Sequence, residues 1–543
     1  MLQTLAVIGR EFPLELARQV ISEPDDELNR LLSDLQLSEF IYERPAAGEI
    51  EYTFKHALTQ EVAYNSLLQE HRKMLHERIG GSIEAQFPNQ LNDWVTTLAH
   101  HYRQSDNVGK AVEYLGRAGQ QALLRSSYSD ALGKLNAAID LLQKLPSNTD
   151  GLYRELALQS QLVQALIGVK GWAASDTELA YDRVCHLAEL ASDPYQLVSG
   201  LWGLSVVKLV RAELRGARES AEKLVELVAA VAGVEGKRDP ALFVQAYLAL
   251  GPILTWLGDV IEARRYLEQV NAVYESRRHG SIASLFGGVD PRVFCLGYLL
   301  WTLWHLGYPD QAQELSNEAL ALAQELSHPH SQAFALTFAA YLHQCRGDVE
   351  KTRKDVATLI SISAEQGLPN YLAWGTILRG WTLAESGYRQ EGITQMRQGL
   401  VALRATGERV SSAYHLTLIA EQYSKAHKFE QTSQSLEESS ALVELKGIRL
   451  YEVEVHRLRG ELLLFSDTQE ANRCFGKAIE VSRRQGTRSL ELRATASLAR
   501  LLAAEGRRDE ARTKLAEIYN WFTEGFDTAD LKDAKALLDE LSA

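Results

Sequence analysis

Small and apolar residues recur through the C-terminal half of the chain at the spacing of paired helices. A small or short side chain opens the second helix of each expected pair, and the next such residue follows 39 or 40 positions later. These positions are Ala312, Thr352, Gly392, Thr432, Ala471 and Ala511. Twelve residues before most of them a small or apolar residue marks the first helix, and Gly460 takes that place in the shorter repeat. Because one hairpin cannot bury its apolar face alone, the pattern predicts stacked hairpins, that is, an α-solenoid.

The same register extends toward the N-terminus, where it resembles the tetratricopeptide pattern. Residues 92–125 and the helix after them carry small and large apolar side chains at the intervals of that pattern, namely Ala99, Tyr102, Ala111, Leu115, Ala118, Ala131, Leu135 and Ala138. Further hairpins are expected at wider spacings, centred on Ala180, Ala217 and Ala263. Gly258 and Gly307 follow expected first helices, where glycine can take the left-handed conformation that ends a helix. We therefore predict an all-α fold in which residues 89–526 form tetratricopeptide-like repeats.

The first 88 residues differ because they contain two short β-rich segments. Phe40–Glu43 and Ile50–Phe54 are rich in aromatic and β-branched residues, and Pro45 and Gly48 predict a turn between them. Helical patterns occupy residues 2–9, 13–21, 25–37, 57–66 and 69–86. Three helices, a β-hairpin and further helix are the order of a winged-helix domain, which we expect at residues 1–88.

The last residues, 527–543, predict a capping helix. Asp527 or Thr528 is the expected N-cap. One face is apolar, with Leu531, Ala534, Leu538 and Leu541. The other face is polar, with Asp530, Lys532, Asp533, Lys535, Asp539 and Glu540. A solenoid needs such a terminal element, because its last repeat otherwise exposes an apolar surface.

Charge and composition disfavour nucleic acid and membrane as partners. Seventy-one acidic and 57 basic residues give a net charge of −14. The third helix of the expected winged helix, within residues 24–37, carries four acidic residues against Arg30 alone, so a DNA phosphate backbone would repel it. The four cysteines lie far apart, the N-terminus lacks a signal-peptide pattern, and no run of 18 apolar residues occurs. We expect a cytoplasmic protein.

Several segments resemble one family. The run EYTFKHALTQEVAYNSLL (51–68), with VIGREFP (7–13), resembles the winged-helix segment of bacterial signal-transduction ATPases with numerous domains. Residues 98–131 and the tail 521–541 are similar to later parts of the same proteins. In that family a P-loop ATPase, in some members preceded by a class III adenylyl or guanylyl cyclase domain, comes before a winged helix and tetratricopeptide-like repeats. The resemblance covers nearly the whole chain and implies the last two of these parts.

The catalytic parts of that family are missing. No G-x-x-x-x-G-K-[ST] loop occurs, so no motif cradles the phosphates of a nucleotide, and no cyclase domain is present. We therefore expect no enzyme and no cofactor. The resemblance implies that His56, with Lys55, approaches a nucleotide phosphate only if an ATPase domain is supplied in trans; otherwise both are structural. The chain starts just inside the winged helix, which leaves a separate gene, a split partner and a truncated reading frame open.

Histidine pairs raise the question of a metal site. His100 and His101 point to different faces of one helix, and His328 and His330 have no third ligand nearby in sequence. The sequence contains no HExxH and no G-x-S-x-G pattern, and no G-x-G-x-x-G pattern follows an expected strand. No metal is expected.

Aromatic and arginine side chains of the middle repeats are the candidate partner-binding residues. They are Arg292, Trp301, Trp304, Arg346, Arg353, Trp374, Arg379 and Trp381. The tryptophans fit either a core between helices or an aromatic groove, and the loop at 279–292 fits either a binding loop or a plain exposed loop. In the groove interpretation, residues 280–400 hold a peptide or protein of acidic and apolar character.

These patterns predict a non-enzymatic sensor and protein-interaction module of a signalling ATPase or adenylyl cyclase system. Its partner is a peptide or protein, with an ATPase or cyclase domain on another chain as a further candidate. The alternative is a transcription regulator of the repeat-containing ATPase type.

Overall fold

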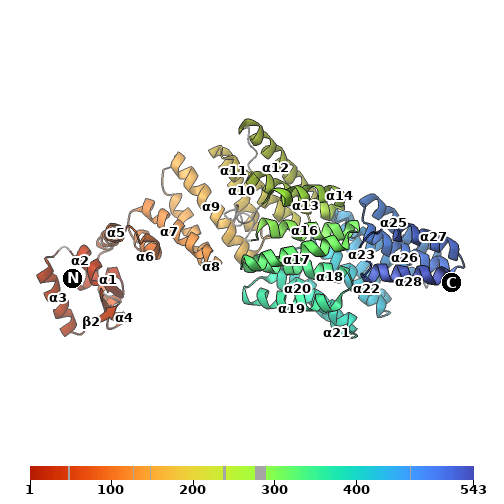
Figure 1. The fold of residues 1–543 in the computed structure, drawn as a ribbon. Helices are drawn as coiled ribbons and strands as arrows, with labels where there is room; N and C mark the ends of the chain where they lie inside the picture. The colour runs from red at the N-terminus through yellow and green to blue at the C-terminus, as the bar shows by residue number, and fades with distance from the viewer. Residues whose placement is uncertain are drawn as a thin grey trace. The chain divides into compact units, whose positions relative to one another are not determined.

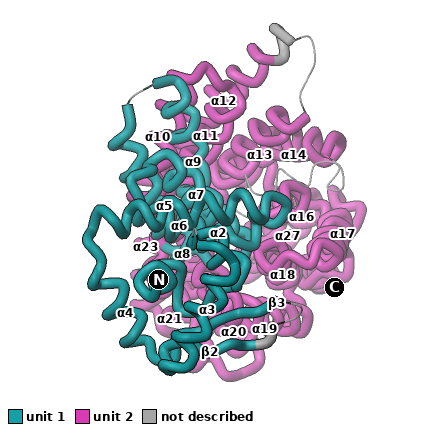
Figure 2. Tube along the Cα trace, turned by 90° about the vertical axis from the view of Figure 1, so that its left-hand side faces the viewer, with its two compact units in different colours: residues 1–169 teal, residues 170–543 magenta. Residues whose placement is uncertain are grey.

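The computed structural model describes residues 1–543 except 22, 47–48, 126, 147, 236–239, 275–288, 465 and 543. The chain divides into two compact units, residues 1–169 and 170–543, shown in teal and magenta in Figure 2. The sequence placed a division after residue 88, which falls inside the first unit. Each unit is described below by itself.

The first unit opens with helices around a small sheet. Its first elements are α1 (Leu2–Ile8), β1 (Glu11–Pro13), α2 (Leu14–Val20), α3 (Asp25–Leu37), β2 (Ile41–Ala46) and β3 (Glu49–Phe54). The sheet is antiparallel in the order β1-β3-β2, with Phe12 opposite Tyr52 and Tyr42 opposite Thr53. The three helices and the hairpin were predicted. The three-residue strand β1 was not, because so short a segment carries no alternating pattern.

Helices complete the first unit. They are α4 (Ala57–Asn65), α5 (Gln69–Gln86), α6 (Leu91–Arg103), α7 (Val108–Leu124), α8 (Tyr128–Leu142) and α9 (Thr149–Lys170). Ala111, Ala131 and Ala138, which the repeat pattern singled out, are at most 1% exposed. Leu135 packs so closely on α7 that a methyl group added to Gly119 would lie 2.7 Å from it. Small residues therefore set the distance between these helices.

The second unit consists of helices through the described part of residues 170–543. They are α10 (Ser175–Ala191), α11 (Pro194–Val210), α12 (Leu214–Glu235), α13 (Pro240–Leu257), α14 (Val260–Val273), α16 (Pro291–Leu306), α17 (Pro309–Glu325), α18 (Pro329–Cys345), α19 (Val349–Glu365), α20 (Pro369–Glu385), α21 (Arg389–Ala405), α22 (Ser412–Lys425), α23 (Phe429–Lys446), α24 (Glu452–Leu463), α25 (Thr468–Gln485), α26 (Arg488–Ala504), α27 (Arg508–Tyr519) and α28 (Ala529–Ser542). Figure 1 shows them following one another as antiparallel neighbours. The predicted all-α fold is confirmed.

The small residues that defined the 40-residue repeat lie at helix crossings. All six, in α17, α19, α21, α23, α25 and α27, are buried. Gly380 of α20 and Gly392 of α21 meet backbone to backbone, because a methyl group on Gly380 would lie 2.6 Å from the carbonyl oxygen of Gly392. Gly307 ends α16 in the left-handed conformation, with φ of 94°, as its position predicted.

The second unit is wound so tightly that its successive turns touch. The carbonyl oxygen of Trp256 accepts a hydrogen bond from the amide of Leu450 at 3.2 Å, and that of Arg346 accepts one from the amide of Ala529 at 3.1 Å. Ser489 donates to the carbonyl of Trp304 at 2.5 Å, 185 residues away. In Figure 1 the green helices α16 to α18 accordingly lie beside the blue helices α26 and α28. The carbonyl groups at the ends of these first helices thus accept hydrogen bonds from repeats that lie about half the length of the unit further along the sequence.

Two helices of this unit need separate mention. Pro240–Leu257 has the length and the mean hydropathy, 1.4, of a membrane span, but 72% of that window is buried inside the protein. It is packed as a core helix. In α28 the buried apolar residues are Leu531, Ala534, Leu537 and Leu541, whereas Leu538 is half-buried. The predicted amphipathic helix is present, with Leu537 rather than Leu538 completing its apolar face.

Candidate functional site

A cleft of about 310 Å³ opens among the first helices of the C-terminal repeats. Residues from α18, α20, α22, α24, α26 and α28 line it, together with Val349 at the start of α19. Charged side chains dominate the lining: Lys425, Arg457, Arg493, Arg500, Glu385, Glu421, Glu461, Asp530 and Asp533. So many charges beside a buried core need partners, because an unpaired charge away from water is costly.

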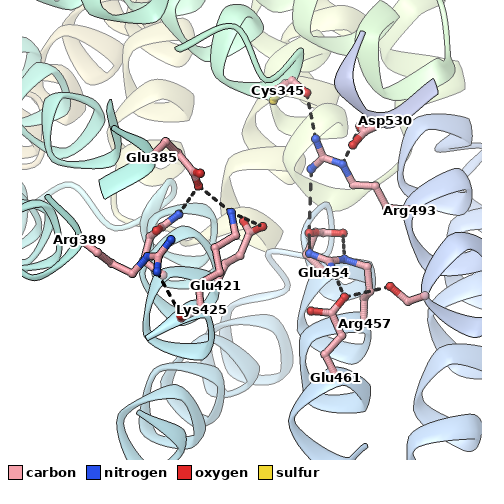
Figure 3. Close-up of polar contacts among 12 residues, drawn as sticks. Cys345, Glu385, Arg389, Glu421, Lys425, Glu454, Arg457, Glu461, Arg493 and Asp530 are labelled. Carbon is pink, nitrogen blue, oxygen red and sulfur yellow. Dashed lines mark hydrogen bonds and ion pairs between the residues drawn. The ribbon is translucent and has the colours of Figure 1, made fainter. Parts of the chain in front are cut away.

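One wall is organised by Arg457 of α24, shown in Figure 3. Its Nε and Nη2 donate to the two carboxylate oxygens of Glu454 at 2.9 and 2.7 Å, and its Nη1 donates to Glu461 at 2.5 Å. Ser497 of α26 donates to the same oxygen of Glu461 at 2.9 Å. Only 9% of the Arg457 side chain and 6% of the Glu454 side chain are exposed. The pair is therefore a fixed, bidentate part of the wall.

Arg493 of α26 links that wall to α28 and to the end of α18. Its Nε donates to Asp530 of α28 at 2.8 Å, and its Nη2 donates to the carbonyl oxygen of Cys345 at the end of α18 at 2.9 Å. Burial would raise the pKa of Glu454, but Arg457 and Arg493 hold this pKa below its usual range. Burial raises the pKa of Asp530, and Arg493 opposes that rise. The cations thus keep Glu454 charged inside the protein.

The facing wall is built around Lys425 at the end of α22 (Figure 3). Its ammonium lies 2.6 Å from Glu385 of α20 and 3.4 Å from Glu421 one turn earlier in α22. Gln422 donates to the same oxygen of Glu385 at 2.6 Å. Arg389 donates to the carbonyl oxygen of Lys425 at 3.2 Å. This wall is less buried, since 39% of the Lys425 side chain and 30% of the Glu421 side chain are exposed.

The charged residues of the cleft recur in the sequence at a step of 36. Glu385, Glu421, Arg457 and Arg493 form one such row, and Lys425, Glu461, Ser497 and Asp533 form a second. Against the repeat of about 40, each step falls four residues behind, which is about one turn of helix. The rows therefore cross the successive first helices diagonally. The 40-residue repeat alone does not reveal these two rows.

The predicted partner-binding tryptophans are mostly in the core. Trp301 and Trp304 are 1% and 3% exposed, and Trp301 stacks on Tyr341 at 5.9 Å between ring centroids. Trp374 is half-buried and donates to Glu408 at 2.6 Å. Because these aromatic rings fill the inner side of the middle repeats, the expected groove over Trp301 and Trp304 is not open. Trp381, 4% exposed, is the one of the four that lines the cleft.

The predicted arginines are not brought together. Arg292 pairs with Glu318, and Arg353 pairs with Glu350 on the exposed side of α19. Arg379 is exposed on α20. Arg346 is largely buried and binds Asp527. None of the four lines the cleft, and the loop at 279–292 falls mostly outside the described residues.

His56 and Lys55 lie in the first unit at the junction of β3 and α4. His56 is exposed at the N-terminus of α4 and makes no side-chain capping bond. Lys55 pairs with Glu39 and lies 5.6 Å from the ring centroid of Tyr42.

The histidines of α5 and α6 form a buried contact. Nδ1 of His76 lies 2.9 Å from Nδ1 of His101, and the hydroxyl of Tyr64 lies 3.1 Å from Nε2 of His76. Among the described residues no three His, Cys, Asp or Glu side chains are arranged to hold a metal. Burial lowers the pKa of His76 to about 4 and that of His101 to about 3.

No protein-family model matches the chain. An uncharacterized protein of Rhizobium meliloti (strain 1021) is 24% identical over 514 residues, which cover 92% of this chain and 48% of the relative. The chain thus spans about half the length of this curated relative. Among solved structures, a Rap protein in complex with the competence and sporulation factor is 11% identical, covers 69% of this chain and 98% of its own, and superposes with a TM-score of 0.51.

The likeness to the Rap protein shows a shared tetratricopeptide-like helical-repeat fold. A signal-transduction ATPase with numerous domains and a tetratricopeptide repeat sensor, from Pyrococcus horikoshii, matches at 12% identity over 99% of this chain and 64% of its own. Its TM-score of 0.29 is too low to support an inference.

Proposed function

We propose that the protein is a non-enzymatic sensor and interaction module that binds a peptide or a segment of a partner protein in the inner cleft of its second unit. The observation that carries this proposal is the cleft itself. Seven helices contribute to it, and the charges of one wall are fixed in place by a buried network. A polar site held rigidly by its scaffold binds with less loss of entropy than a flexible one.

The signalling context is part of the proposal. The order α1, β1, α2, α3, β2, β3 supports a winged helix at the N-terminus, and the curated relative has about twice the length of this chain. We assign the chain to a cytoplasmic ATPase or adenylyl cyclase system, with the catalytic domain on another chain or segment. His56 and Lys55 would then face the nucleotide of that domain.

A transcription regulator is the second candidate, favoured by the same element order. The charge of α3 opposes it, since Asp25, Asp26 and Glu27 open the helix. Titration of labelled duplex DNA at low salt separates the two, because a DNA-binding module would show affinity that falls steeply with added salt.

The cleft is tested by selection of short random peptides displayed on phage against the full chain. Asp533→Trp places a large side chain at the cleft, and Asp539→Trp places the same side chain outside its lining on the same helix. We expect peptides that bind the parent and the Asp539→Trp variant but not the Asp533→Trp variant. Selection that yields no peptide sensitive to Asp533→Trp would contradict the proposal.

A further inference from the structure

We infer that the occupant of the cleft is a peptide that carries a positive charge, a lysine or arginine side chain or a free N-terminal amine. This inference rests on the proposed function and adds the chemistry of the ligand. It follows from an account of which donors and acceptors in the cleft are already used.

The cations of the cleft have their partners within the protein. Arg457 uses all three of its guanidinium nitrogens on Glu454 and Glu461. Arg493 is divided between Asp530 and the carbonyl of Cys345, and its remaining nitrogen lies 4.0 Å from Glu454. Lys425 lies between Glu385 and Glu421, and Arg500 binds Asp533. A ligand carboxylate would have to displace one of these internal partners.

The carboxylates of the cleft, by contrast, keep acceptor oxygens that no group of the described residues uses. In Glu385, Glu461, Asp530 and Asp533, the hydrogen bonds from the described residues all fall on one carboxylate oxygen. The second oxygen of each has no partner among the described residues. The same holds for Glu421, whose contact with Lys425 uses one oxygen. The lining holds five carboxylates and four cations, a formal charge of −1. Free acceptors and excess negative charge both favour a cationic donor.

Gln344 supplies an independent indication that the ligand is a peptide. This side chain lines the cleft and is only 6% exposed. Its amide oxygen accepts from the hydroxyl of Tyr414 at 2.6 Å, whereas its amide nitrogen has no partner among the described residues. This nitrogen is not among the buried side-chain atoms that lack a partner, so it reaches solvent in the cleft, where the backbone carbonyl of a bound peptide can accept a hydrogen bond from it. Trp381 lines the same cleft, and an aromatic ring attracts a cation.

This inference replaces the acidic, apolar partner that the arginines of the middle repeats predicted. That prediction depended on arginines with free donors, and Arg292, Arg346 and Arg353 are all engaged by carboxylates. In the cleft the groups that remain free are carboxylate oxygens, which favour a cationic partner rather than an acidic one.

The test uses three fluorescent hexapeptides that alternate alanine with lysine, with glutamate or with serine, titrated against the full chain by anisotropy. We expect the lysine peptide to bind, the other two to bind at least about tenfold more weakly, and added salt to weaken the lysine peptide. The combination of Glu421→Gln and Asp533→Asn, which removes two charges without changing side-chain size, should weaken the lysine peptide by about tenfold.

Two further variants make the result decisive. Arg500→Gln removes a cation from the lining and should strengthen binding of the lysine peptide. Glu350→Gln changes a carboxylate that is 80% exposed and outside the lining, so it should change nothing. If the glutamate or serine peptide binds best and is lost in Asp533→Trp, the cleft is a peptide site but the inferred charge is wrong. If no peptide is sensitive to Asp533→Trp, the proposed function fails as well.

Discussion

Arg346 donates from one guanidinium nitrogen to both carboxylate oxygens of Asp527, at 2.7 and 2.9 Å, across 181 residues of sequence. Another of its nitrogens donates to the carbonyl oxygen of Pro309 at 2.7 Å. Asp527, two residues before α28, is thereby tied to the end of α18. Since Arg493 makes a second such link through Asp530 and Cys345, the two helices that close the cleft are held by paired charges.

Arg346→Ala should loosen α28 more than it loosens the rest of the unit. Loss of buried charge-assisted hydrogen bonds costs about 2 kcal/mol, which is about a 30-fold loss of amide protection in hydrogen exchange. Arg353→Ala is the matched control, because Arg353 forms an exposed pair in the next helix and such pairs contribute about 0.5 kcal/mol or less. Equal protection of residues 529–542 in both variants would show that the link is not needed.

Glu454→Gln should destabilise the second unit by about 3 kcal/mol, since it leaves Arg457 and Arg493 without their shared carboxylate. The pKa of Glu454 is lowered in the folded state, so its contribution is present above the unfolded pKa of about 4.3 and is lost as pH falls toward the folded value. Chemical denaturation between pH 7 and 3 should therefore show a difference between the parent and the variant that is constant down to about pH 5 and shrinks below it. A constant difference across this range would contradict the assignment.

Gly380→Ala should destabilise the protein by about 3 kcal/mol or more, because the added methyl group meets backbone atoms of Gly392 and Met396 at 2.6 and 2.7 Å. Gly476→Ala is the control in a helix interior with nothing within 4 Å of the new methyl group. It should stabilise the protein by up to about 1 kcal/mol through helix propensity. Thermal melting of the two variants tests the close crossing directly.

The buried histidines should make the first unit sensitive to acid. His76 and His101 have folded pKa values of about 4 and about 3, below the unfolded value of about 6.5, so the unfolded state gains protons first as pH falls. Each histidine then removes up to about 1.4 kcal/mol of stability per pH unit below 6.5. Hydrogen exchange of residues 1–169 between pH 7 and 5 should show this slope. His76→Asn should flatten it, and His71→Asn on the exposed side of α5 should not.

The sequence was sufficient for the helices and their crossings but not for the site. Small residues such as Ala312 and Gly392 are dictated by close local packing, so their 40-residue spacing predicted the hairpins. The winding of the second unit depends on small rotations between many repeats, which no local pattern records. Only that winding brings Cys345 beside Arg493, and it also fills the space over Trp301 with aromatic rings.

The prediction for the capping helix shows the same limit. Its amphipathic pattern was recognised, but Asp530 was assigned to a solvated face because its partner lies in another repeat. In the structure it receives Arg493 and lines the cleft. Charged rows at a step of 36 residues were present in the sequence, and they gained meaning only once the diagonal path across the first helices was known.

A binding site in the cleft fixes the position of the bound peptide, and photo-crosslinking measures this position directly. A photoreactive phenylalanine derivative replaces Asp533, which lines the cleft, or Asp539, on the same helix outside the lining, and each protein is irradiated with the lysine hexapeptide. We predict a covalent adduct from position 533 and none from position 539, and excess unlabelled peptide should abolish the adduct. Equal adducts from both positions, or an adduct from position 539 alone, would contradict a binding site in the cleft.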